Sequence, residues 1–171
     1  MRKTKYIAFS AMMSALGTVI LFLGSLIEMM DLTAVLVASV CIFVCGYEMG
    51  IKAMPVYVVT AVISFLVLPS KLVAVEYALF GIYPILKIFF DKAKKPFSWL
   101  FKVLYILVSV SADILLMFFV FMLQDAWYIE VLFLVLGTAA FIIYDVALSR
   151  LTLLYKYNLR HRLRIDRFFG N

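Results

Sequence analysis

Four charged side chains lie within long apolar stretches of the sequence, and they are the residues best suited to chemistry: Glu76, Lys87, Asp113 and Asp145. A charge at membrane depth costs at least ~2.5 kcal/mol on insertion scales, so it must face protein or water and marks a candidate functional site. On a helix, one narrow stripe collects Glu76, Phe80, Tyr83 and Lys87. The stretch 68–87 is therefore predicted to be an apolar helix with one polar face.

The depth of each charge follows from the rise of ~1.5 Å per residue along a helix. Counted from the ends expected to lie outside the cell, Glu76 is about 7 Å deep, Asp113 about 15 Å, and both Lys87 and Asp145 about 25 Å. Because Lys87 and Asp145 share a level, we expect an internal ion pair that fixes the register of two helices. Glu76 and Asp113 have only Lys71, near the surface, as a cation at their own level. They are the better ligand candidates, although two protonated, hydrogen-bonded carboxyls also fit.

Three aromatic residues and a methionine accompany the two acids: Tyr77, Phe80, Tyr83 and Met117. Aromatic walls around a carboxylate suit a cationic or amine-bearing, partly flat molecule. The sequence thus predicts a substrate site formed by Glu76, Asp113 and these four side chains. The alternative interpretation is that such aromatic residues anchor the protein at the membrane surface.

The elements that position these residues follow from composition. The chain has 171 residues, of which 67% are hydrophobic and 15% charged, and its mean hydropathy is +1.11. A soluble domain of this size cannot bury so much apolar side chain. We therefore expect a single all-α, polytopic membrane domain over residues 1–171, with a first helix that is retained rather than cleaved. Polar breaks divide it into six transmembrane helices of the length a bilayer requires, at about 6–27, 32–47, 51–68, 71–90, 97–123 and 128–155, followed by a basic tail at 156–171.

Orientation follows from the basic residues, which gather in cytoplasmic loops. With the N terminus inside, the outer loops carry only Lys71, while the cytoplasmic side receives Arg2, Lys3, Lys5, Lys52, Lys92, Lys94, Lys95, Lys102, Arg150 and the tail. We expect an N-in, C-in topology. The net charge of +6 is then explained by topology and by contact with anionic membrane lipids, and no motif points to nucleic acid.

The first helix carries small residues at helical spacing, among them Ala8, Ala11 and Ala15. Small residues allow another helix to approach closely, which drives association where lipid offers no hydrophobic contrast. The face can serve packing within the monomer or docking of a partner membrane protein.

Taken together, the N-terminal basic cluster followed by IAFSAMMSALG, and the placing of polar intramembrane residues in the last three helices, resemble the substrate-binding S components of energy-coupling factor (ECF) transporters. The resemblance implies a bacterial plasma-membrane protein that captures a micronutrient, such as a vitamin, at the outer face. It also implies that Ala8, Ala11 and Ala15 contact a transmembrane T component, and that two ATPase subunits drive uptake. The chain has no GxxxxGK[ST] phosphate loop, so any use of ATP must come from partners.

Two other classes stay open. One is a non-enzymatic scaffold of the cell envelope, like the rod-shape membrane protein MreD, in which the buried acids are internal hydrogen-bond partners. The other is an intramembrane enzyme, which the sequence disfavours: no expected span contains histidine, and neither HExxH nor GxSxG occurs. Cys41 and Cys45 lie without a nearby histidine or further cysteine, so no metal or other cofactor is expected.

Overall fold

The computed structural model describes residues 2–27, 31–91, 95–120 and 127–159, and within these ranges every regular element is helical. In chain order, the elements are α1 (Arg2–Gly24), α2 (Asp31–Met49), the short 3₁₀ segment η2 (Gly50–Ala53), α3 (Met54–Val67), α4 (Lys71–Phe80), α5 (Tyr83–Phe90), α6 (Lys95–Val120), α7 (Trp127–Leu154) and a π-helical turn, η3 (Tyr155–Leu159). The all-α prediction is confirmed for this part of the chain.

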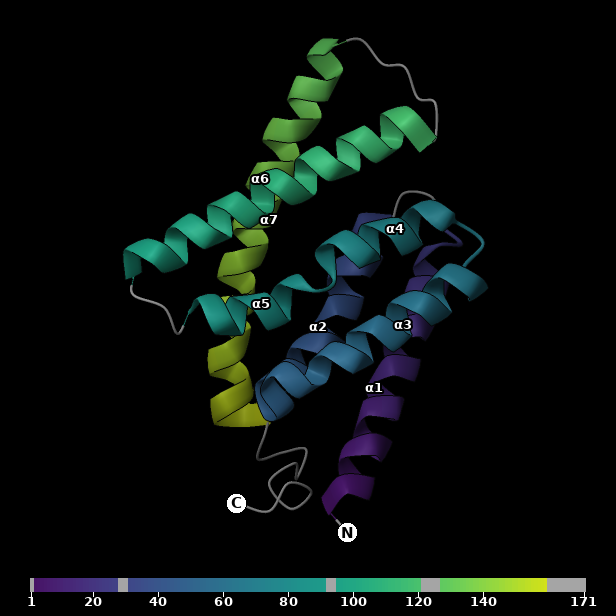
Figure 1. Cartoon of the computed structure of the whole chain (residues 1–171), viewed down its shortest axis with the longest axis vertical. Coiled ribbons are helices and arrows are strands. Elements are labelled where there is room, and N and C mark those ends of the chain that lie inside the picture. Colours follow the sequence, from purple (N-terminus) through teal and green to yellow (C-terminus); the bar gives the residue numbers. More distant parts are fainter. Residues whose placement is uncertain (1, 28–30, 92–94, 121–126, 160–171) are drawn as a thin grey trace.

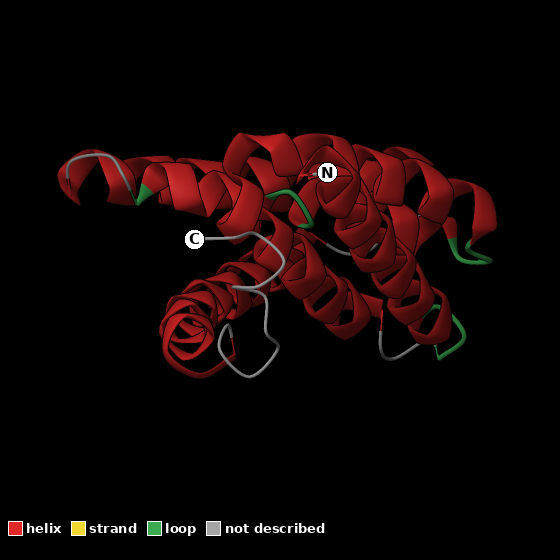
Figure 2. Ribbon diagram, turned by 90° about the horizontal axis from the view of Figure 1, so that it is seen from below, coloured by secondary structure: helices red, strands yellow, loops and turns green. Residues whose placement is uncertain are grey.

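Helix α2 lies at the centre of the molecule. It packs against α1, α3, α4 and α5, while α6 packs against α7 and reaches the rest of the fold through α4 and α5 (Figure 1). The apolar residues of α2, such as Val35, Ile42 and Phe43, are almost completely buried. Seen from below in Figure 2, the helices cross one another at an angle instead of forming a parallel bundle.

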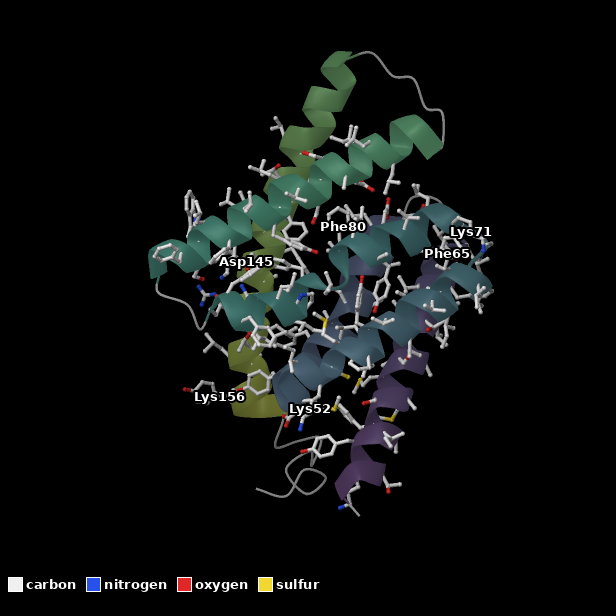
Figure 3. The ribbon with its side chains drawn as sticks, in the orientation of Figure 1. Lys52, Phe65, Lys71, Phe80, Asp145 and Lys156 are labelled. Atoms are coloured by element: carbon white, nitrogen blue, oxygen red, sulfur yellow. The ribbon has the colours of Figure 1, made fainter. Side chains whose placement is uncertain are left out.

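One end of the molecule collects the start of α1, the turn between α2 and α3, and the end of α7 (Figure 1). Figure 3 labels Lys52 and Lys156 at this end, and Lys71 away from it at the start of α4. We call it the basic end, and the region where α2 and α4 begin the acidic end, because Asp31 and Glu76 belong to it.

Five segments are long and apolar enough to cross a membrane: Thr4–Gly24, Asp31–Val67, Lys71–Phe90, Phe97–Leu116 and Val135–Tyr157. The second contains α2, η2 and α3, and the chain reverses direction within it (Figure 1). Gly50 at this reversal has a φ of 62°, a conformation that residues with a Cβ rarely adopt. Large apolar side chains cover the outside, and Leu66 and Ile143 are 73% and 70% exposed. Such a surface is that of a membrane protein.

The expected helix at 71–90 is divided into α4 and α5 at Gly81 and Ile82. Pro84 causes the break, because its ring displaces the carbonyl one turn earlier and it has no N–H to donate. Gly81 closes α4 by donating its N–H to the carbonyl of Tyr77 at 2.8 Å. A Cβ at Gly81 would lie 2.8 Å from the ring of Tyr77, so the turn requires glycine.

The other boundaries also shift. The first helix begins at Arg2 and ends at Gly24, and α3 has 14 residues because η2 takes the start of the expected third helix. Of the predicted basic tail, only 156–159 lies within the described residues.

Candidate functional site

The predicted partners Lys87 of α5 and Asp145 of α7 lie together in an ion pair between Lys87 Nζ and Asp145 Oδ1. Lys87 Nζ also donates to the backbone oxygen of Asp145 and to Ser149 Oγ, both at 2.9 Å. Tyr83 OH donates to Asp145 Oδ1 at 2.6 Å. Lys87 is only 2% exposed, so its charge depends on these acceptors.

Two residues that sequence reasoning did not assign to this group join it from α6 and the end of α5. Lys102 Nζ lies 3.7 Å from Asp145 Oδ2 and forms a second ion pair with Asp91. The sequence signal for Asp91 was its position one helical turn after Lys87, on the same face. We call Tyr83, Lys87, Asp91, Lys102, Asp145 and Ser149 the basic-end network. Every charge in it has a partner, as an internal brace between α5, α6 and α7 requires.

The aromatic residues predicted to line a substrate site are core side chains. Tyr77 and Tyr83 are 0% exposed and Phe80 is 5% exposed. The ring centroids of Tyr83 and Phe141 lie 4.6 Å apart, and those of Phe80 and Phe141 lie 5.6 Å apart. Tyr105 stacks on Tyr83 at 5.4 Å. A ligand that reaches Phe80 or Tyr83 has to displace this packing. The side chain of Met117, in α6, lies outside the described residues.

The two remaining candidates, Glu76 of α4 and Asp113 of α6, differ from everything in the basic-end network. Glu76 is 7% exposed, and its Oε2 atom has no hydrogen-bond partner; the same is true of Asp113 Oδ1. Helices α4 and α6, which carry these two acids, pack against each other. Lys71, the nearest expected cation, donates instead to the backbone oxygens of Phe65 at 2.8 Å and Leu68 at 3.0 Å. The structure thus leaves one oxygen of Glu76 and one of Asp113 without a donor among the described residues.

Helix α1 uses its small residues in two ways. Ser14 is buried and accepts a hydrogen bond from Thr60 of α3 at 2.8 Å, so this side packs within the monomer. Ala8, Ala11 and Ala15 are exposed. The predicted docking alanines are therefore accessible at the surface of α1.

The described residues contain no obvious metal-binding site. No group of three or more histidine, cysteine, aspartate or glutamate side chains lies close enough there to hold an ion. Cys41 and Cys45 are free thiols buried in α2.

Comparison with known proteins gives no relative. No protein-family model, no curated protein and no solved structure matches this chain. Function must therefore be argued from the site itself.

Proposed function

We propose that this chain is the substrate-binding subunit of a bacterial plasma-membrane transporter and that it takes a cationic or amine-bearing small molecule, of micronutrient type, at Glu76 and Asp113. One observation carries the proposal. Glu76 and Asp113, on the packed helices α4 and α6, each have a buried carboxyl oxygen without a hydrogen-bond partner, whereas the buried Lys87 is paired with Asp145. Buried polar groups are nearly always satisfied, so such exceptions are characteristic of functional positions.

The arrangement of helices supports a transporter with six spans and both chain ends inside. Counting α2 and α3 as two spans, and α4 with α5 as one broken span, gives six crossings in which α1 begins and α7 ends on the same side. The basic end then faces the cytoplasm, in agreement with the distribution of lysine and arginine. Glu76 and Asp113 lie in the outer half, where a substrate arrives. A span broken near membrane depth is common beside transporter sites, where backbone groups are freed to contact a ligand.

The chemistry of the ligand follows from the energetics of the acids. Burying an unpaired carboxylate costs on the order of several kcal/mol in lost hydration. Binding a proton or a cation offsets this cost. An ammonium group between Glu76 and Asp113 supplies donors for both open oxygens. Energy for transport comes from partners, as in the ECF systems that the sequence resembles, since this chain has no phosphate-binding loop.

The test starts with the small molecules that remain bound after mild detergent purification from the native membrane, identified by mass spectrometry. Glu76→Gln and Asp113→Asn should each lose the bound molecule while the protein keeps its elution volume and helical circular dichroism. Asp91→Asn is the matched control, because this acid is exposed and already paired with Lys102. Retention of the same molecule by both variants would refute the proposal. If both variants unfold, the acids are structural.

A second function, a membrane scaffold of the cell envelope, is favoured by the exposed alanines of α1. A scaffold binds neighbouring proteins through this face and needs no small molecule. Ala15→Leu should then release the co-purifying envelope proteins, whereas Glu76→Gln should leave them bound. A transporter subunit should instead co-purify with T-component and ATPase subunits. The identity of the co-purifying proteins therefore distinguishes the transporter from the scaffold.

A further inference from the structure

A groove with a volume of about 740 Å³ opens at the basic end, between the start of α1, the end of α2 and the start of α3. It is lined by side chains of opposite character. Tyr6, Glu48 and Lys52 line the part nearest the basic end, and Ala11, Pro55 and Val59 line the part further along α1 and α3. The substrate proposal makes no use of this groove, which lies away from Glu76 and Asp113.

The charged groups at the rim are not equivalent. Glu48 accepts a hydrogen bond from Tyr155 OH at 3.0 Å, so its position is held by η3. Lys52 is exposed, and its side chain makes no ion pair or hydrogen bond with any described residue. Glu48 and Lys52 lie four residues apart, but they form no ion pair with each other. One cation at the mouth of the groove is therefore available to an anion.

The groove changes from polar to apolar along its length. Lys52 and Val59 are separated by seven residues, which is about 10 Å along the helix axis. Ile7 and Val59 are 69% and 50% exposed, so the walls are apolar side chains facing outward. A cationic rim at the membrane surface, followed by an apolar channel directed toward the bilayer centre, matches the shape of a phospholipid.

We propose that this groove binds one anionic phospholipid of the cytoplasmic leaflet, with its phosphate group on Lys52 and an acyl chain along Ala11, Pro55 and Val59. Charge complementarity selects this occupant over another helix. A partner helix of apolar residues would leave Lys52 unpaired, whereas a lipid phosphate neutralises it. Basic residues at the cytoplasmic surface are attracted to anionic lipid, and in the sequence Arg2, Lys3 and Lys5 directly precede the groove residue Tyr6.

The test measures which lipid stays bound. The protein is purified in mild detergent, incubated with equal amounts of phosphatidylglycerol and phosphatidylcholine carrying the same acyl chains, and analysed by native mass spectrometry. The wild type should retain one phosphatidylglycerol in preference to phosphatidylcholine. Lys52→Gln should lower that preference about fivefold, the effect of one surface lysine on anionic lipid, and Lys52→Arg should preserve it.

Matched variants separate the groove from the general charge of the protein. Lys156→Gln removes a basic residue at the same end that does not line the groove, and it should leave the preference unchanged. Ala11→Trp fills the groove and should abolish retention, while Ala15→Trp, one turn further along the same exposed side of α1, should not.

Three results would overturn the proposal: equal retention of the two lipids by the wild type, an equal loss of preference in Lys52→Gln and Lys156→Gln, or lipid retention unaffected by Ala11→Trp. Release of a second copy of the chain or of another protein by Ala11→Trp, with lipid unchanged, assigns the groove to that partner instead. If Lys52→Gln fails to fold, the comparison of Ala11→Trp with Ala15→Trp still tests whether lipid binds in the groove.

Discussion

Replacing Asp145 with asparagine tests whether the basic-end network is a brace built around one buried charge. The substitution keeps the shape of the side chain but removes the countercharge of Lys87, which is 2% exposed. Two neutral acceptors remain at 2.9 Å, the backbone oxygen of residue 145 and Ser149 Oγ. Breaking a buried pair on one side costs ~3–5 kcal/mol, and the remaining acceptors place the expected loss near ~3 kcal/mol.

The opposite substitution, Lys87→Met, should cost less. Asp145 is 23% exposed and still accepts from Tyr83 at 2.6 Å, and Lys102 remains 3.7 Å from its second oxygen. We expect a loss of about 1–2 kcal/mol, because the carboxylate keeps a cation, a donor and some access to water. The double variant leaves no unpaired buried charge, so its loss should be smaller than the sum of the two by about 1–3 kcal/mol.

The measurement is the free energy of unfolding in mixed micelles, obtained by titrating sodium dodecyl sulfate and following helical circular dichroism. Asp91→Asn removes the more exposed carboxylate of the same network, which is 49% exposed, and its loss should be smaller than that of Asp145→Asn. Additive losses in the cycle, or a larger loss for Lys87→Met than for Asp145→Asn, would show that the reasoning about the countercharge is incorrect.

Two further predictions concern the residues around this network. Tyr83→Phe removes the hydroxyl that donates to Asp145. It should lower the free energy of unfolding by about 1.5–3 kcal/mol, as expected for a hydrogen bond to a charged group. No change in the same titration would mean that the hydroxyl is dispensable. Gly81→Ala places a Cβ 2.8 Å from the buried ring of Tyr77 and should destabilise the protein by about 1–3 kcal/mol. Ala78→Gly, on the exposed side of α4, should cost about 1 kcal/mol. Equal effects of the two changes would contradict the steric argument.

The sequence predicts well those features that depend on composition and on position along a helix. Apolar length gives the helical segments, and equal depth places Lys87 beside Asp145. The break between α4 and α5 was also readable, because Pro84 stands inside the apolar run, but a span of full length favoured a continuous helix.

Contacts that depend on the rotation of each helix and on the angles between helices could not be predicted from the sequence. A periodic stripe shows that Phe80 and Tyr83 share a face, but it does not show that Phe141 of α7 fills the space in front of them. The participation of Lys102 likewise requires the angle between α5 and α6. Aromatic residues on a polar stripe suit a ligand and a core equally well, so only the packing separates the two.

The contrast between the two ends of the molecule is the strongest argument that the acidic end is functional. In the basic-end network, the buried Lys87 has three acceptors, one of them a backbone oxygen, and the Asp145 carboxylate has two donors and a second cation at 3.7 Å. The same fold leaves Glu76 of α4 and Asp113 of α6 each with a buried oxygen that has no hydrogen-bond partner. A buried polar oxygen without a partner carries a desolvation penalty that an apolar side chain at the same position would avoid. Such a penalty is expected where a cation or a proton is bound and released, because oxygens already hydrogen-bonded within the protein are not available to a ligand.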